Sequence, residues 1–444
     1  MCRNSQLFEQ LPPRKDLDAR STRPPGNLRP HSFAPPGPAR RTLQTDFTSQ
    51  EYLRDPVQSL EQLRRSGPVI QTRFPIVGKV WITTTYDAAG KVLKDSETFT
   101  LRKEGGGLAG LPWWMPRIVR TLAHNMLTMD EPDHARLRGL VDEAFRRRAI
   151  LEMEPRILAI ADKLASELFE DVSPADLVER YARKLPLSVI CELLGLPRAD
   201  RPKFLAWAST VSRITGSLVS FWHMIRGLSA MRPYLEERLQ AAREHGGEGL
   251  IAELVRVEKE GGRISSDEMV SMIFLLLGAG SETTTHLISG SVYELIKNPN
   301  LRDWLEEDWS RANLAVEEFL RFISPVQFSK PRFVRKDTEL GGVRLKKGEK
   351  IMAMVAAANM DPKANENPEK LDLQRHPNRH LAFGTGIHFC LGYQLARIEG
   401  KCALEALFGR WPKLELAVQP KEIGWRKRPG LRAIETLPVV VRSR

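Results

Sequence analysis

An uninterrupted run of about 20 apolar residues, the length that a membrane-spanning helix needs, occurs nowhere in this sequence of 444 residues. The first residues also lack the apolar stretch of a secretory signal. These absences argue against a helical membrane protein and against a secreted one. We therefore expect a cytoplasmic protein without a membrane anchor.

Cysteines are few, and the sequence indicates no nucleotide-binding domain. The four cysteines, Cys2, Cys191, Cys390 and Cys402, form no CxxC pair, so they indicate neither a disulfide framework nor a zinc ribbon. No GxGxxG segment opens a βαβ unit, which argues against a built-in flavin or nicotinamide domain.

Positive charge is in moderate excess, with a formal net charge of +12. Residues 1–44 hold eight basic and three acidic residues, so their +5 leaves only +7 for the other 400 residues. No basic stripe interleaved with aromatic residues indicates a nucleic-acid groove. The mildly basic body favours an acidic protein partner and no nucleic acid.

The first 44 residues contain eight prolines and little that could form a packed face. We expect residues 1–44 to be a disordered Pro- and Arg-rich extension and residues 45–444 to form a single domain. The Arg-rich, acid-poor start also resembles a transit peptide, but its prolines oppose the amphipathic helix of such peptides.

Helical periodicity dominates from Asp46 onward, and strand-like pieces are few. The hydrophobic content of 42% and charged content of 27% are those of a globular protein. The sequence therefore predicts a mainly α fold with a minor β-sheet region. The expected strands cover residues 69–74, 80–84 and a cluster near 332–343, and the main amphipathic helices cover residues 133–145, 157–168, 185–194, 231–243, 250–259 and 312–322.

The longest predicted helix covers about residues 267–297, with Ser265 or Ser266 as its N-cap and Asn298-Pro299 as its stop. It is about 45 Å long, enough to cross a domain. The glycines and threonines of residues 278–285 in its middle have poor helix propensity. We expect a local distortion there, which serves either a close helix crossing or a functional site.

A second signal is the segment FGTGIHFCLG at residues 383–392, which places Cys390 in a glycine-rich loop directly before an amphipathic helix. Glycines let backbone N–H groups approach the sulfur, and the helix N-terminus adds partial positive charge. Both effects favour the thiolate, which can bind a metal or attack a carbon atom.

The residues alone leave alternatives open for this thiolate. Nucleophilic catalysis needs a base beside the thiol, and the position of His388 two residues away does not establish one. A zinc site of His376, His380, His388 and Cys390 has spacings unlike the usual pairings, and the proline after His376 opposes a shared helical face.

The ten residues from Phe383 to Gly392 fill every defining position of FxxGx(H/R)xCxG, the haem-binding loop of the cytochrome P450 family, which the chain therefore resembles. Three further segments match in the family's order, and the resemblance covers about residues 45–440. Residues 279–283 are similar to the oxygen-activating segment of the central helix, residues 318–321 to the ExxR pair, and residues 130–138 to the propionate-binding helix of soluble bacterial members.

This resemblance implies the cytochrome P450 fold, with its long central helix over haem b (iron protoporphyrin IX). It implies that Cys390 is the axial thiolate ligand of the haem iron and that Glu282 and Thr283 form a catalytic proton relay. The implied haem-binding residues are His134, Arg138, Ala279, Arg332, Phe383, Gly384, His388 and Gly392. The implied structural network that braces the thiolate loop consists of Glu318, Arg321 and Arg375.

The implied reaction inserts one oxygen atom from O2 into a hydrophobic small-molecule substrate. Electrons would come from NAD(P)H through a reductase and a separate ferredoxin or flavodoxin-like protein, which would dock near Arg397, Lys401 and residues 146–148. We expect a monomer. The segments expected to line the substrate pocket are residues 105–126 with Trp113 and Trp114, residues 276–279 and residues 324–328.

Three rival functions remain: a peroxide-driven haem-thiolate hydroxylase or isomerase, a non-enzymatic haem sensor or carrier, and nucleic-acid binding through residues 1–44. Glu282 and Thr283 argue against the first, because peroxide-driven chemistry does not need their relay. The second needs neither Thr283 nor an apolar pocket, and the third predicts DNA affinity that falls steeply with salt.

Overall fold

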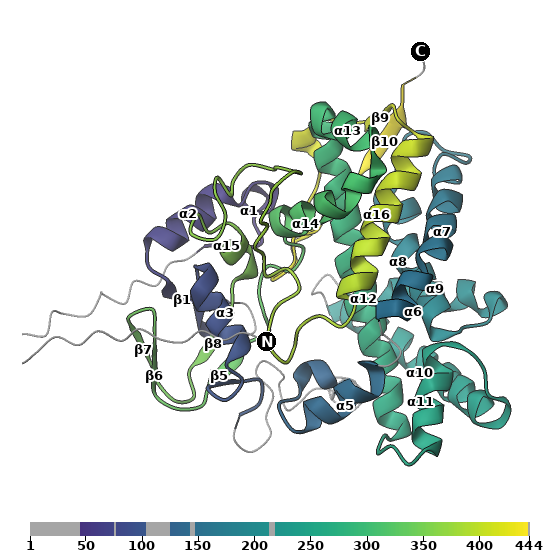
Figure 1. The fold of residues 1–444 in the computed structure, drawn as a ribbon, viewed down its shortest axis with the longest axis horizontal. Helices are drawn as coiled ribbons and strands as arrows, with labels where there is room; N and C mark the ends of the chain where they lie inside the picture. The colour runs from purple at the N-terminus through teal and green to yellow at the C-terminus, as the bar shows by residue number, and fades with distance from the viewer. Residues whose placement is uncertain (1–44, 75–76, 104–124, 143–146, 213–217, 443–444) are drawn as a thin grey trace, which may run out of the picture. The chain divides into compact units, whose positions relative to one another are not determined.

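The computed structural model describes residues 45–74, 77–103, 125–142, 147–212 and 218–442. The segment 1–44, whose disorder the sequence predicts, lies outside this part of the chain, as do Trp113, Trp114 and Arg146. Helices dominate the described residues and strands form small sheets, which confirms the mainly α prediction (Figure 1). None of the helices described is both long and apolar enough to cross a bilayer.

Figure 1 labels the elements in chain order. The α-helices are α1 Gln50–Arg54, α2 Val57–Arg65, α3 Tyr86–Lys94, α5 Asp133–Asp142, α6 Arg147–Glu152, α7 Glu154–Ser166, α8 Lys184–Leu194, α9 Arg201–Ser212, α10 Leu218–His245, α11 Gly249–Lys259, α12 Ser266–Lys297, α13 Pro299–Glu306, α14 Ala312–Ile323, α15 Val355–Asn359 and α16 Tyr393–Arg410. The shorter turns of helix are η1 Met126–Thr128, η2 Val178–Ala182, η3 Arg198–Asp200, η4 Trp309–Arg311 and η5 Pro420–Glu422. The strands are β1 Val69–Phe74, β2 Gly78–Thr83, β3 Phe99–Thr100, β4 Ala175–Asp176, β5 Arg332–Val334, β6 Thr338–Leu340, β7 Val343–Leu345, β8 Lys350–Met352, β9 Leu414–Leu416 and β10 Pro438–Val441.

The largest sheet joins the strands that follow α2 and α3 to the strands that follow α14. Its strand order is β1-β2-β8-β5-β3, with β1 and β2 as an antiparallel hairpin and β8 parallel to β2. Phe99, Ile351 and Val92 are buried in the cluster that seals this sheet against α3. The sheet thereby fixes Arg332, which opens β5, relative to the helices.

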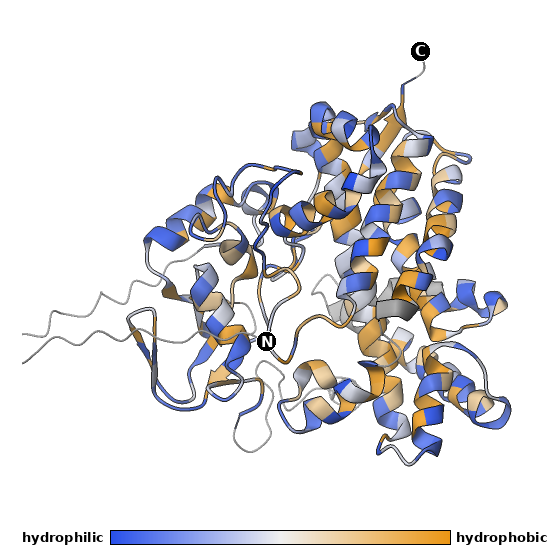
Figure 2. Ribbon diagram, viewed as in Figure 1, coloured by the Kyte–Doolittle hydropathy of each residue, from blue (hydrophilic) through white to orange (hydrophobic). Residues whose placement is uncertain are grey.

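Helix α12 lies at the centre of the helical part, in contact with α8, α14 and α16 (Figure 1). The surrounding helices each carry both hydrophilic and hydrophobic residues (Figure 2). This mixture is expected of helices that bury one face and expose the other. Ser265 caps α12 with a capping box, since its hydroxyl accepts from the Glu268 N–H and the Glu268 carboxylate accepts from the Ser265 N–H. The predicted N-cap Ser265 is thus confirmed.

The distortion expected at residues 278–285 does not interrupt α12, which is helical throughout this segment. The hydroxyls of Ser281, Thr283 and Thr285 each donate to the carbonyl four residues earlier, at 2.6, 2.7 and 2.8 Å. Such bonds satisfy the hydroxyl groups within the helix, and they often bend a helix without breaking it.

Several helix boundaries were predicted within one or two residues, including α8, α11 and α14, and β1 has its predicted bounds. The largest error is α10, which covers residues 218–245 although the sequence favoured a helix over 231–243. Pro233 lies inside α10, and a proline normally indicates a helix start or a break. Packing against α9, α11 and α12 stabilises the longer helix.

Candidate active site

Cys390 lies in a loop that immediately precedes α16, whose N-cap is Gly392. The Cys390 N–H donates to the Phe383 carbonyl at 2.9 Å, which folds the loop back on itself. The predicted glycine-rich loop before a helix is therefore present. This fold places the thiol next to the helix N-terminus, where partial positive charge favours an anion.

Two glycines give the loop its shape. Gly384 and Gly386 have φ values of +66° and +77°, in the left-handed region that side chains disfavour. A Cβ on Gly386 would lie 2.6 Å from the Leu93 carbonyl oxygen, closer than atoms can approach. A larger residue there would push the Cys390 loop away from α3.

The Cys390 thiol is subject to opposing electrostatic effects. Burial raises its pKa above the ordinary value, whereas a hydrogen bond from the Gly392 N–H and the charges of Arg138 and Arg397 lower it. Burial is the larger effect in the protein chain, so the thiol is not activated as a free nucleophile. A bound metal cation would reverse this balance by coordinating the thiolate.

The middle of α12 borders open space. Gly278 and Ala279 are exposed, although Leu277 before them is buried. A Cβ built on Gly278 would meet no atom within 4 Å. Leu391, the residue after Cys390, packs on the same hydrophobic cluster as Leu277. Helix α16, which begins directly after the thiol loop, contacts α12.

Five basic side chains gather beside the thiol loop: His134, Arg138, Lys330, Arg332 and His388. The rings of His134 and His388 meet edge to face with centroids 4.5 Å apart. Burial, followed by the charges of the other four residues, lowers the pKa of His388 to about 3. His388 Nε2 and Arg332 Nε are buried without a hydrogen-bond partner. The cluster is suited to an anionic group that the described chain does not supply.

Glu282 and Thr283 both lie on α12, shortly after the exposed residue Ala279. Their polar atoms already form a hydrogen bond or an ion pair within the chain. The Thr283 hydroxyl donates to the Ala279 carbonyl at 2.7 Å. Glu282 forms an ion pair with Arg428 and lies 3.9 Å from His286 Nε2. Burial alone would raise the pKa of Glu282, but His286 and Arg428 outweigh it and lower the pKa. Glu282 is therefore a carboxylate at neutral pH.

Comparison with known proteins identifies the family to which this arrangement belongs. The Cytochrome P450 family model matches residues 228–423. Vitamin D(3) 25-hydroxylase of Pseudonocardia autotrophica is 38% identical over 407 residues, which cover 91% of this chain and 98% of that protein. The chain belongs to the cytochrome P450 family.

Solved structures of relatives agree with this fold. Cytochrome P450 PksS of Bacillus subtilis 168 has a TM-score of 0.80 and 35% identity, over 89% of this chain and 99% of that chain. Cytochrome P450 MoxA of Nonomuraea recticatena has a TM-score of 0.83 and 30% identity, over 91% and 100%. A myxobacterial cytochrome P450 in complex with myristic acid has a TM-score of 0.81 and 34% identity, over 90% and 99%. The chain is accordingly a haem-dependent monooxygenase.

The residues of this cytochrome P450 fit a haem. The unpartnered Nε atoms of Arg332 and His388 offer hydrogen bonds to propionates, and Cys390 offers a thiolate. A Cβ on Gly278 or Gly392 would meet nothing within 4 Å, so no other part of the described chain packs closely against these two positions. A zinc site has no support, because no group of three metal-binding side chains occurs in the described ranges.

The ExxR residues of this cytochrome P450 form a buried network. Glu318 and Arg321 have no exposed side-chain surface and are joined at 2.7 and 2.8 Å. Arg375 approaches Glu318 at 3.2 Å, and Asn378 donates to the same carboxylate at 2.9 Å. Arg321 also donates to the backbone carbonyls of residues 359, 368 and 370, so the network fixes the chain that leads to the thiol loop.

A second network, built on the neighbouring residue Glu317, was not predicted. Its carboxylate accepts a hydrogen bond at 2.8 Å from Arg397 and approaches His380 Nε2 at 3.0 Å. The Arg397 guanidinium lies over the rings of Phe383 and Tyr393, at 4.6 and 5.4 Å from their centroids. Glu317 therefore orients a cation that packs on the first residue of the thiol loop.

Replacing Glu317 with Gln should destabilise the protein by about 3 kcal/mol at pH 7. Burial would raise the pKa of this carboxyl, but hydrogen bonds from Arg397 and His380 lower it from 4.5 to about 2. Because the folded pKa is the lower one, the stabilisation exists above about pH 4.5 and is lost as the pH falls toward 2. The measurement is the free energy of unfolding in urea at pH 7 and pH 3. The difference in this free energy between wild type and variant should fall by roughly half at pH 3. A pH-independent difference would contradict the lowered pKa as the origin of the stabilisation.

Some predicted site residues make contacts that the sequence did not predict. Phe328, expected to line the substrate pocket, packs in the core against Phe47 and Phe74 with centroids 5.0 Å from each. Lys401 pairs with Glu154 at 2.7 Å, and Arg397 pairs with Glu317, so each of these predicted docking cations has an acidic partner within the chain. Sequence spacing could not reveal these acidic partners, which come from other helices.

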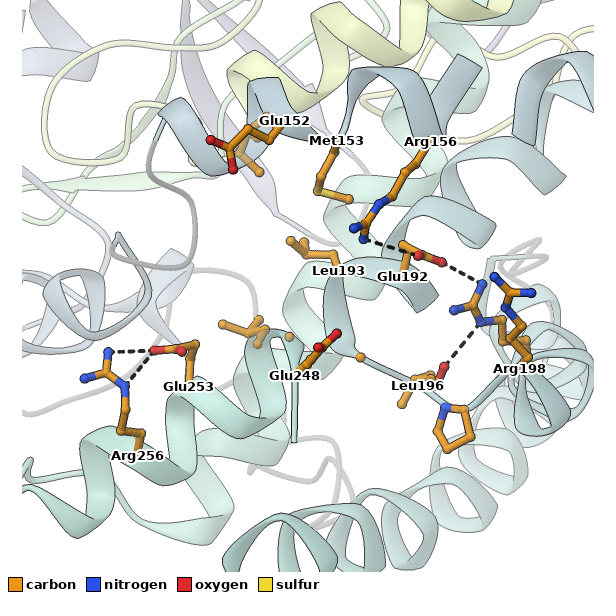
Figure 3. A pocket seen from close by; sticks show the side chains of 16 residues that line it. Glu152, Met153, Arg156, Glu192, Leu193, Leu196, Arg198, Glu248, Glu253 and Arg256 are labelled. Atoms are coloured by element: carbon orange, nitrogen blue, oxygen red, sulfur yellow. Dashed lines mark hydrogen bonds and ion pairs between the residues drawn. The ribbon is translucent and has the colours of Figure 1, made fainter. Parts of the chain in front are cut away.

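A surface cleft of about 820 Å³ lies away from the thiol loop, between α7, α11 and the turn after α8 (Figure 3). Four glutamates and four arginines line it, and several are paired, such as Arg201 with Glu192 at 2.7 Å. No predicted site residue reaches it. Its charged walls are unsuited to the hydrophobic substrate expected of a monooxygenase.

Proposed function

We propose that this cytochrome P450 holds haem b through Cys390, with the haem propionates at His134, Arg138, Arg332 and His388. The observation that carries the proposal is a pair of buried nitrogens, Arg332 Nε and His388 Nε2, that have no hydrogen-bond partner in the described chain. Buried polar atoms without partners are costly, so these two favour a ligand that accepts hydrogen bonds, such as a propionate. In this proposal the haem ring lies against α12 at Ala279, which is exposed.

The bound haem supplies reductive activation of O2 and insertion of one oxygen atom, promoted by the electron-rich thiolate. Thr283 Oγ1 holds a proton at the exposed face of α12, once it exchanges its bond to the Ala279 carbonyl. The Glu282 carboxylate can return a proton to that hydroxyl from the water that reaches its partner Arg428. The ion pair between Glu282 and Arg428 must loosen for this transfer, because it lowers the pKa of Glu282 and keeps the carboxyl group deprotonated.

A hydrophobic small molecule is the proposed substrate. The residues Leu275 and Leu276, which precede the open face of α12, are apolar and only half-buried. Relatives support this class, since one is named for the hydroxylation of vitamin D3 and another was solved with myristic acid. We propose a monomer in the cytoplasm, as the sequence predicts.

Electrons would come from NAD(P)H through a reductase and a separate ferredoxin or flavodoxin-like protein. Phe389, directly before Cys390, is exposed, and its carbonyl accepts from Arg138 at 2.8 Å. The outer side of the thiol loop therefore offers a surface at which a donor can approach. The net charge of +7 on residues 45–444 favours an acidic donor.

The proton relay can be tested by replacing Thr283 with Ala. Product formation should fall by about 100-fold, the usual contribution of positioned proton transfer. Electron consumption should continue, with hydrogen peroxide released in place of product. The measurement is product and peroxide formed per NADPH oxidised, with a ferredoxin, its reductase and an oxidisable apolar compound.

Thr285→Ala provides the matched control, because Thr285 makes the same bond to the carbonyl four residues earlier but is buried. It should keep product and electron consumption coupled. Two results together would instead indicate a peroxide-driven enzyme. Wild type would turn over as fast with hydrogen peroxide as with the electron donor, and Thr283→Ala would not change the peroxide-driven rate.

A further inference from the structure

His286 is a buried histidine on α12 whose ring lacks a hydrogen-bond partner. Its side chain is 1% exposed, and neither Nδ1 nor Nε2 is hydrogen-bonded within the described part of the chain. A neutral imidazole has one N–H donor and one acceptor nitrogen, and leaving them unpaired in the interior is costly. Buried polar groups in folded proteins are normally paired, so we expect this ring to gain a partner in a working state of the protein.

Glu282 is placed to become that partner. It lies one helical turn before His286, so the two side chains project from the same face of α12. His286 Nε2 is 3.9 Å from Glu282 Oε1. A hydrogen bond needs about 3 Å, so a movement of the carboxylate by about 1 Å would form one.

Glu282 has a different partner in the structure. Its carboxylate forms an ion pair with Arg428, whose side chain is 34% exposed, whereas Glu282 itself is 10% exposed. The oxygen that pairs with Arg428 is Oε1, the same atom that lies 3.9 Å from His286 Nε2. One carboxylate oxygen is therefore within reach of both an exposed cation and a buried imidazole.

The charges around His286 favour a neutral ring. Burial has the largest effect and lowers the pKa of His286, the charges of Arg426 and Arg183 lower it further, and Glu282 opposes them. Arg183 directly follows η2, which contacts α12. At pH 7 the imidazole is therefore neutral, and it can donate one N–H to a carboxylate without bringing a charge of its own.

We propose that His286 is a positioning residue of the proton relay, whose Nε2–H binds the Glu282 carboxylate when that carboxylate leaves Arg428. The inference rests on the haem monooxygenase function proposed above, in which Glu282 leaves its ion pair to return a proton to Thr283. The new hydrogen bond replaces part of the lost ion pair, so it lowers the free-energy cost of the transfer. The imidazole keeps its own proton throughout.

The test replaces His286 with Leu, which fills the site without a donor, and with Gln, which keeps an N–H donor of similar reach. His286→Leu should lower product formation per haem by about tenfold, because a hydrogen bond to a charged group is lost. The solvent isotope effect on product formation should rise, since proton transfer becomes slower. His286→Gln should restore most of the activity. In a Glu282→Gln background, His286→Leu should have no further effect.

Ser289→Ala provides the matched control. Ser289 lies one turn further along α12 and is fully buried, and its hydroxyl also has no partner among the described residues. It is about two turns from Glu282 along the helix, so its loss should change neither product formation nor the isotope effect. Equal losses in Ser289→Ala and His286→Leu would overturn the inference, because they would show a general effect of the buried site.

A second readout does not depend on turnover. Arg428→Met removes the competing cation, so Glu282 should turn to His286. The proton on His286 Nε2 should then move downfield in the NMR spectrum of the ferrous carbon monoxide form, as expected for a stronger hydrogen bond. An unchanged Nε2 proton, or normal product formation by His286→Leu, would overturn the inference and leave the monooxygenase function standing. Wild type that binds haem but oxidises no compound would refute the proposed function, and the inference with it.

Discussion

Replacing Cys390 with Ser should reduce substrate oxidation by at least about 1,000-fold, which corresponds to about 4 kcal/mol of lost transition-state stabilisation. The thiolate is the electron-rich ligand that oxygen activation requires, and a serine hydroxyl remains protonated at neutral pH. The Cys390 sulfur also has its own support, a hydrogen bond from the Gly392 N–H. Product formation and haem content per protein measure the effect.

The same substitution at Cys402 provides a matched control. Cys402 lies on α16, twelve residues further along the chain, and is buried in the core. Burial raises its pKa to about 12, so it stays a thiol. Cys402→Ser should keep haem and turnover. Retention of turnover by Cys390→Ser would contradict the assignment of the ligand.

Replacing Arg321 with Ala should destabilise the protein by about 3–5 kcal/mol, because it removes one cation from a fully buried carboxylate. Glu318 would keep Arg375 at 3.2 Å but lose both short bonds to Arg321. The carbonyls of residues 359, 368 and 370 would also lose their donor. Urea unfolding should show the loss, and haem retention should fall with it.

A second ExxR pair in the same chain provides the control. Glu253 and Arg256 have the same spacing on α11 and are joined at 2.7 Å, but both side chains are more than 40% exposed. Arg256→Ala should leave the free energy of unfolding close to that of wild type. Equal destabilisation by the two substitutions would show that burial does not govern the effect.

These two pairs illustrate what sequence can and cannot predict. Spacing alone treats Glu253 with Arg256 and Glu318 with Arg321 alike, and only the family order of the motifs distinguishes the second pair. The thiol loop was predictable because glycine, cysteine and helix signals are contiguous in residues 383–392. Helices with regular periodicity, such as α8 and α11, were predictable for a similar reason.

Contacts between distant segments were the part that sequence could not provide. Arg428 is 146 residues from Glu282, and no local pattern indicates that the two form an ion pair. Glu317 stands beside Glu318, yet one binds Arg397 and the other Arg321, according to the side of α14 on which each lies. Tertiary packing decides each of these roles.

The central claim is that Cys390 ligates haem iron as a thiolate, and the most direct measurement is the visible spectrum of the purified protein after reduction with dithionite under carbon monoxide. We expect a strongly red-shifted Soret band in wild type and its loss in Cys390→Ser. Folded wild-type protein that shows no haem absorbance after haem supplementation, or a Soret band without this red shift, would contradict the claim.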